Sequence, residues 1–219
     1  MSSGSGKAMT LYKYRNLTNL DWTIDILLKR RLYASKYVNL NDPMEGFFYH
    51  HGLSKSKLES ILKDKLSFRI CSLSKSSTDI GLWTFYADEG RGCCIEVEPE
   101  TDGWKYKEIE YNQDVPEIKD AVNGQFDVPS IVRILCTKTE RWKYEQEIRF
   151  IKSVGRSNQS TYLGVKLKNV ILGYNINEEK KEIITTLVET LNKNRSHEDS
   201  IGIKKMTKKE LTYDILQRG

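Results

Sequence analysis

The stretch 144-YEQEIRF-150 has the pattern of a β-strand with one charged face and one apolar face. Side chains at positions i and i+2 of a strand point to the same side of a sheet, so Glu145, Glu147 and Arg149 are predicted to share a face. The apolar residues that alternate with them are predicted to point into the core. If that face is exposed to solvent, ion pairs between the glutamates and Arg149 stabilise the protein by well under about 1 kcal/mol. The pattern therefore indicates either a solvent-facing strand or part of a functional site.

The segments around this strand predict a fold that mixes strands and helices. Strands are expected where β-branched and aromatic residues gather, at 10–15, 66–74, 93–98, 104–111, 163–174 and 200–206. Helices are expected from apolar periodicity and capping residues, after Asn19, after Ser56 and over 81–88, 129–143 and 178–193. Strands and helices do not alternate strictly, which favours an α+β fold.

Local signals refine these boundaries. NLNDPMEG, residues 39–46, combines Asn, Asp and Pro, which favour chain reversal. Ser56 and Glu59 have capping-box spacing, and Pro129 suits the first turn of the helix that it begins. Asn177 is predicted to cap the helix over 178–193.

Length and composition predict one soluble, cytoplasmic domain. The chain has 219 residues and a formal net charge of +5. Residues 10–219 are predicted to form a single domain, and 1–9 a flexible leader or expression remnant. No stretch approaches the ~20 apolar residues of a membrane span. The four cysteines contain no CxxC pair, which predicts a reducing compartment and no metal site.

Polar residues recur in three of the predicted strands. Arg15 ends the first strand, Ser72 and Ser74 form an i, i+2 pair in the second, and Glu145 and Glu147 form another in YEQEIRF. This order of arginine, serine and glutamate resembles that of the ADP-ribosyltransferases of the Arg–Ser–Glu type.

Longer motifs resemble the bacterial family known as domain of unknown function 2971. The matching motifs, in order, are LYKYR (11–15), NLNDPMEG (39–46), CSLS (71–74), LWTFYADEGRGCCIEVE (82–98) and WKYEQEIRF (142–150). The chain departs from that pattern at Phe85, where the family is expected to carry histidine. The two resemblances together imply an ADP-ribosyltransferase-like fold, with a split mixed or antiparallel sheet flanked by helices.

The resemblance also implies NAD as co-substrate. Cleavage of the bond between nicotinamide and ribose develops positive charge on the sugar, which the carboxylate of Glu147 would stabilise. Glu145 would orient or deprotonate the incoming nucleophile. Arg15 would bind the pyrophosphate with its planar fork, and Ser72, with Ser74 behind it, would brace the nicotinamide ribose.

Several assignments stay open at this point. Trp83 and Tyr86 would either stack on nicotinamide or belong to the core, and Arg15 would either bind phosphate or pair with Asp21. The acceptor of ADP-ribose would be a nucleic acid or a protein. By analogy, a toxin or phage-defence role, with an antitoxin or regulatory partner, would suit such an enzyme.

Two other classes of function fit parts of the pattern. A magnesium-dependent nuclease would use Glu145, Glu147 and either Asp42 or Glu96 as oxygen ligands. A binding module without catalysis would recognise nucleic acid or a protein, and the basic residues Lys204, Lys205, Lys208 and Lys209 would then carry the binding.

Overall fold

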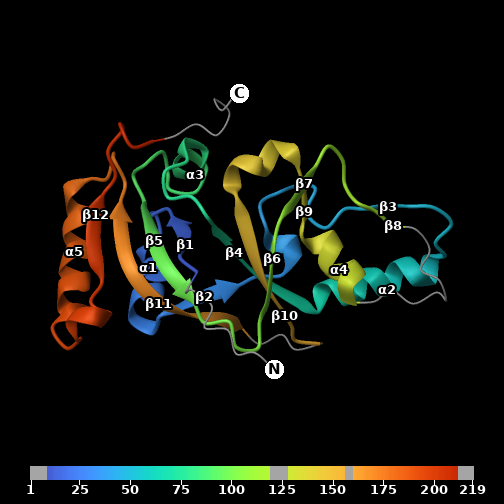
Figure 1. Cartoon of the computed structure of the whole chain (residues 1–219), viewed down its shortest axis with the longest axis horizontal. Coiled ribbons are helices and arrows are strands. Elements are labelled where there is room, and N and C mark those ends of the chain that lie inside the picture. Colours follow the sequence, from blue (N-terminus) through green and yellow to red (C-terminus); the bar gives the residue numbers. More distant parts are fainter. Residues whose placement is uncertain (1–8, 119–127, 156–159, 212–219) are drawn as a thin grey trace. The chain divides into compact units, whose positions relative to one another are not determined.

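The computed structural model describes residues 9–118, 128–155 and 160–211. The chain divides into two compact units, each assembled from separate segments (Figure 1). The first unit comprises Met1–Leu32, Leu73–Glu100 and Gly164–Gly219, and the second comprises Tyr33–Ser72 and Thr101–Leu163. The predicted leader over 1–9 lies outside the described residues except for Met9. Whether 10–219 behaves as one domain stays a prediction.

The first unit contains a mostly antiparallel set of strands. Its strands are β1 (Leu11–Arg15), β5 (Cys93–Pro99), β11 (Thr161–Leu172, from Gly164 onward) and β12 (Gly202–Lys205). They run in the order β12-β11-β5-β1. Strand β5 pairs antiparallel with both β1 and β11, whereas β12 pairs parallel with β11. The pairing of Arg15 with Cys93 fixes where β1 ends relative to β5.

Three α-helices of the first unit begin at side-chain caps. They are α1 (Leu20–Lys29), α3 (Ile80–Phe85) and α5 (Glu178–Asn192), and a 3-10 turn, His197–Asp199, follows α5. Asn19, Asp79 and Asn177 each accept a hydrogen bond from a backbone N–H of the first turn, which satisfies one of the donors that a helix start leaves unpaired. The predicted caps Asn19 and Asn177 are thereby confirmed. Helix α5 packs beside β12 (Figure 1).

The turn between α3 and β5 has an unusual backbone. Asp88, Glu89 and Gly90 all have positive φ, at 52°, 51° and 77°, a conformation that side chains with a Cβ disfavour. A Cβ on Gly90 would lie 2.5 Å from the ring of Tyr174. The turn is therefore closely packed as well as left-handed.

The second unit has one larger set of strands and two small strand pairs. The larger set has the order β4-β10-β6, formed by β4 (Phe68–Ser74), β10 (Glu147–Ser153) and β6 (Lys105–Glu108). The parallel pairs are β7 (Glu110–Asn112) with β9 (Thr137–Thr139), and β3 (Tyr49–His50) with β8 (Glu117–Ile118). Three strands cross the unit boundary: β2 (Arg31–Ala34), β4, whose last two residues belong to the first unit, and β11, whose first three residues belong to the second.

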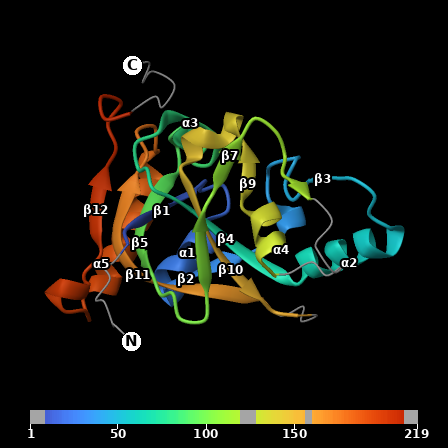
Figure 2. The same cartoon turned by 45° about the vertical axis from the view of Figure 1, so that its right-hand side comes forward.

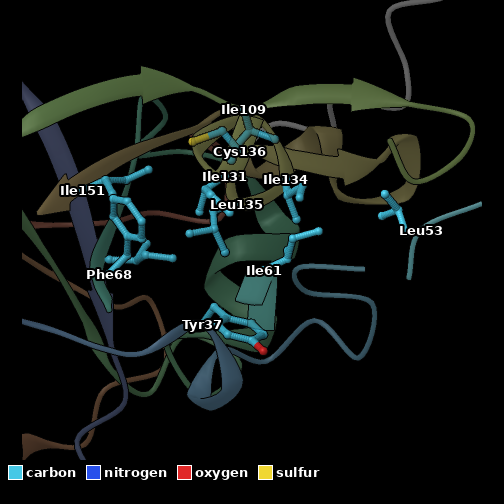
Figure 3. Close-up of a cluster of buried hydrophobic side chains, with 11 residues drawn as sticks. Tyr37, Leu53, Ile61, Phe68, Ile109, Ile131, Ile134, Leu135, Cys136 and Ile151 are labelled. Carbon is cyan, nitrogen blue, oxygen red and sulfur yellow. The ribbon is translucent and has the colours of Figure 1, made fainter. Parts of the chain in front are cut away.

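Helices of the second unit pack around an apolar cluster. They are α2 (Lys55–Leu66) and α4 (Val128–Leu135), which lie against each other in both views (Figures 1 and 2), with 3-10 turns η1 (Tyr37–Asn39) and η2 (Glu140–Glu145). Figure 3 shows the cluster, in which α4 directs Ile131, Ile134 and Leu135 toward Ile61 of α2. This packing holds the end of α4, where the chain enters β9.

The observed fold is α+β, with mostly antiparallel strands and flanking helices, as the sequence predicts. One long helix was expected over 129–143, and this is wrong: α4 ends at Leu135, followed by β9 and η2. The side chain of Thr137 donates to the carbonyl of Arg133 at the helix end. Pairing of β9 with β7 then replaces the helical hydrogen bonds.

Two smaller expectations also change. Helix α2 is capped by Ser54, which accepts from the N–H of Lys57, so the capping box at Ser56 does not form. The strand expected over 104–111 is interrupted at Ile109, whose N–H donates instead to the carbonyl of Glu147. In the described ranges no helix is long and apolar enough to span a membrane.

Candidate functional site

The acidic pair lies at the junction between η2 and β10. Glu145 is the last residue of η2, Gln146 has a left-handed backbone with φ 45°, and Glu147 begins β10. The expectation that Glu145 and Glu147 share a strand face is therefore wrong, because Glu145 does not belong to the strand. The structure nevertheless brings their carboxylates together, because both reach one ammonium group, that of Lys138.

Lys138 lies between the two glutamates. Its Nζ is 2.6 Å from Oε2 of Glu145 and 2.7 Å from Oε2 of Glu147, and its side chain is 4% exposed. The ammonium also lies 5.3 Å from the centre of the Trp142 ring, within the range of a cation–π contact. Strand β9, which carries Lys138, is fixed by its pairing with β7.

Arg149 supplies the second cation. Its Nε donates to Oε1 of Glu147 at 2.7 Å, and its two terminal nitrogens donate to the two carboxylate oxygens of Glu45 at 2.5 and 2.7 Å. A further bond goes to the backbone carbonyl of Leu135. Arg149 is fully buried, so these bonds replace the water that the guanidinium loses.

These side chains form a chain of alternating charge, Glu45–Arg149–Glu147–Lys138–Glu145. Burial alone would raise the pKa of Glu147, but the positive charges of Arg149 and Lys138 outweigh it and hold that pKa well below its usual range. Burial would lower the pKa of Lys138, yet the two carboxylates keep it raised. Glu147 and Lys138 are therefore both charged near neutral pH.

Tyr111 and the turn around Glu45 complete the surroundings. The hydroxyl of Tyr111 accepts the backbone N–H of Glu147 at 2.8 Å, and burial raises the pKa of this phenol. Asp42 accepts the N–H of Met44 at 2.9 Å, which confirms NLNDPMEG as a turn. The buried ammonium of Lys65 donates to the carbonyl of Gly46 at 2.7 Å and fixes the turn from the other side.

Arg15 lies in the first unit, at the end of β1. Among the described residues its buried Nε has no hydrogen-bond partner, and no carboxylate pairs with the guanidinium. The alternative in which Arg15 pairs with Asp21 is therefore not what the structure shows. Its guanidinium lies 5.0 Å from the centre of the Trp22 ring, and Trp22 is 60% exposed. Burial lowers the pKa of Arg15.

The remaining predicted ligand residues have mixed settings. Ser74 is buried and accepts the N–H of Ser76 at 3.0 Å, while Ser72 is half-buried on β4. Trp83 is fully buried, with its indole N–H bonded to the carbonyl of Ser77, and it packs as a core residue. Tyr86 is half-buried at the end of α3. Arg15 and Ser74 belong to the first unit, and Ser72 and both glutamates to the second.

The structure gives little support to a magnesium site. The Lys138 ammonium occupies the position between Glu145 and Glu147 that a divalent cation would take. Glu96 accepts a hydrogen bond from Asn169 and pairs with Lys204, while Asp42 is used in its turn. No cluster of three metal-ligating side chains occurs within 9–118, 128–155 and 160–211.

Two of the four late lysines have partners in the structure. Lys204 lies 3.5 Å from Glu96, and Lys208 lies over the ring of Tyr174. Lys168 and Lys166 on β11 are likewise paired, with Glu98 and Asp199.

Sequence reasoning missed Lys138, Tyr111 and the role of Glu45 as the partner of Arg149. Lys138 was assigned to a helix, so its side chain was not expected beside the acidic pair. The signal available for Glu45 was its place in NLNDPMEG, one of the motifs that carry the family resemblance.

Comparison with known proteins finds no match: no protein-family model, no curated protein and no solved structure is detectably similar to this chain. The resemblances described from the sequence motifs therefore stay predictions. Function has to be argued from the side chains themselves.

Proposed function

We propose that the protein is an NAD-dependent ADP-ribosyltransferase, or an NAD glycohydrolase when water is the acceptor. The observation that carries the proposal is the pair Glu145 and Glu147, whose carboxylates are held about a single ammonium at the start of β10. A fixed carboxylate in a buried setting stabilises developing positive charge more strongly than it would in water.

The reaction assigns one role to each glutamate. The bond between the nicotinamide nitrogen and C1′ of the ribose breaks, nicotinamide leaves with the bonding electrons, and the sugar becomes an oxocarbenium ion. Glu147 stabilises that ion and accepts the hydrogen bond of the 2′-hydroxyl. The acceptor attacks C1′ and loses its proton to Glu145.

Arg15 supports an anionic substrate. Burial disfavours the charged guanidinium of Arg15, and its buried Nε has no hydrogen-bond partner among the described residues. A pyrophosphate group would supply two acceptors for its planar fork. The exposed ring of Trp22 beside it offers a flat surface for a base.

The proposal extends to partners and place of action. The acceptor would be a nucleic acid or a protein side chain, and the enzyme would act in the cytoplasm as a toxin or a phage-defence effector, with an antitoxin or regulatory partner. The mild positive charge of the chain, +5, is compatible with a nucleic-acid acceptor.

A second candidate, a binding module without catalysis, is favoured by the bonding of Glu147. Its Oε1 is taken by Arg149 and its Oε2 by Lys138, and the residue is 4% exposed. A ribose hydroxyl has to replace one of these bonds to reach the carboxylate. If it cannot, the network serves stability alone.

An assay of nicotinamide release from NAD distinguishes the two candidates. It uses the purified protein alone and then with RNA, DNA or cell extract added in turn. The proposal expects release by the wild type and loss of release in Glu147→Gln. Since Glu147→Gln disturbs a buried network, Arg15→Met serves as a second variant outside it, and Glu178→Gln on the exposed start of α5 is the control. Absence of both release and NAD binding by the wild type would favour the binding module.

A further inference from the structure

Lys138 joins two carboxylates that are otherwise held by different parts of the chain. Glu147 is also bonded to Arg149, which is anchored in turn by Glu45. Glu145 reaches this network through its 2.6 Å bond to Lys138. We propose that Lys138 is a positioning residue, whose ammonium holds Glu145 and Glu147 as one unit in the geometry that NAD cleavage needs; this inference rests on the proposed function.

The backbone of Lys138 is fixed before its side chain enters the site. Its Cα is paired with that of Tyr111 in the parallel β7–β9 ladder. Thr137, the preceding residue, is tied to the end of α4 through its hydroxyl. Since the apolar packing of α4 holds this junction, little freedom remains for the ammonium group. Such rigidity is what an oriented pair of carboxylates requires.

Charge explains why the position needs a cation. Two carboxylates close together repel each other, and one of them takes up a proton unless a positive charge lies between them. Arg149 does not serve Glu145, because its donors are already bonded to Glu147, Glu45 and the carbonyl of Leu135. Lys138 is the cation that the described structure places against both.

Other titratable groups also face the pair and have to be counted in any pH profile. These groups lie on four neighbouring segments. They are Arg149 on β10, Tyr111 on β7, Cys136 before β9 and Glu45 in the turn before β3. Burial raises the pKa of the Cys136 thiol to about 12, and that of the Tyr111 phenol is also raised. Neither the thiol nor the phenol changes charge at acidic pH.

The test compares three variants of the full chain: Lys138→Met, Lys138→Arg and, as a matched control, Lys143→Met, which removes an exposed lysine from η2. For each, kcat for nicotinamide release is measured against pH, and the side-chain carboxyl carbons of glutamate are titrated by NMR. We expect Lys138→Met to lower kcat by roughly 100-fold and to move the acidic limb of the profile to higher pH. In Lys138→Arg we expect the acidic limb of the kcat profile to lie at the same pH as in the wild type. The control variant Lys143→Met is expected to match the wild type in both measurements.

The outcomes separate this inference from the proposed function. An unchanged acidic limb and unchanged glutamate titration in Lys138→Met would overturn the role of Lys138, even if kcat fell. If Lys138→Met does not fold, a kcat profile of Lys138→Arg with the acidic limb of the wild type supports the role, and a displaced limb contradicts it. A wild type without NAD turnover would defeat the proposed function and with it the positioning role of Lys138 in catalysis. The carboxyl titration would still show whether Lys138 keeps the pair ionised.

Discussion

Arg149 and Glu45, which are 104 positions apart in the sequence, form a two-bonded ion pair inside the second unit. Their side chains are 0% and 4% exposed. The pair connects the NLNDPMEG turn to the start of β10, so two of the motifs that suggested a family resemblance meet in space. This ion pair holds the start of β10, and with it Glu147, against the turn that carries Glu45.

Removing one member of that pair is expected to destabilise the protein strongly. Glu45→Gln leaves the buried guanidinium with one carboxylate in place of two, and breaking a buried pair costs about 3 to 5 kcal/mol. Urea unfolding at neutral pH measures the loss. Glu178→Gln, which removes an exposed carboxylate paired with Lys181, is the control and leaves the midpoint unchanged. Equal midpoints for Glu45→Gln and the control would show that the network does not hold the fold.

Acid should weaken the second unit through Glu147. Its pKa is held below the usual glutamate value of about 4.3 despite burial, because Arg149 and Lys138 are close. A carboxyl with a lowered pKa in the folded state stabilises fully above its unfolded pKa, and the stabilisation is lost as the pH falls toward the folded pKa. Urea midpoints of the wild type should therefore fall from pH 5 to pH 3 more steeply than those of Glu147→Gln. Parallel curves for the two proteins would contradict the assignment.

Arg15 is expected to contribute to binding and not to stability. It has lost hydration and has no acidic partner among the described residues, so Arg15→Met should leave the thermal midpoint unchanged or raise it. Loss of charge-assisted hydrogen bonds to a pyrophosphate should weaken NAD binding by roughly 10- to 100-fold. Calorimetric titration with NAD measures this, with Lys13→Met on the same strand as the control. A lower thermal midpoint with unchanged NAD affinity would mark Arg15 as structural.

The left-handed turn at Gly90 is expected to resist substitution. Alanine there must adopt a φ of 77° and meets the Tyr174 ring at 2.5 Å, which together should cost about 2 to 4 kcal/mol. Gly52 has a similar φ of 73° with nothing within 4 Å, so Gly52→Ala should cost only about 1 kcal/mol. Thermal unfolding of the two variants compares the costs. Equal costs would mean that packing against Tyr174 contributes nothing.

The sequence predicts much of the fold because its local signals are strong. Alternation in CCIEVE and the caps Asn19 and Asn177 identify β5, α1 and α5 at nearly their observed positions. The failure at 129–143 has a physical cause. Apolar spacing continues past Leu135, but pairing of β9 with β7 is a non-local interaction that local propensity does not reveal.

The candidate site is predictable only in part for the same reason. Glu147 and Arg149 are two apart on one strand, so their contact follows from strand geometry. The contacts of Lys138 and Glu45 depend on chain pairing and on a turn far away in sequence. No motif spacing predicts them. The sequence pattern also underestimates burial, because Glu147 and Arg149 of β10 are as buried as its apolar residues.

The most direct test of the account is nicotinamide release from NAD by the wild type, measured beside Glu147→Gln and Arg15→Met, with each variant checked for a native circular dichroism spectrum. The account predicts release by the wild type, none by Glu147→Gln and reduced release by Arg15→Met at low NAD concentration. Full activity in a folded Glu147→Gln protein would contradict the role of the acidic pair, and no release by the wild type under any acceptor condition would contradict the proposed chemistry.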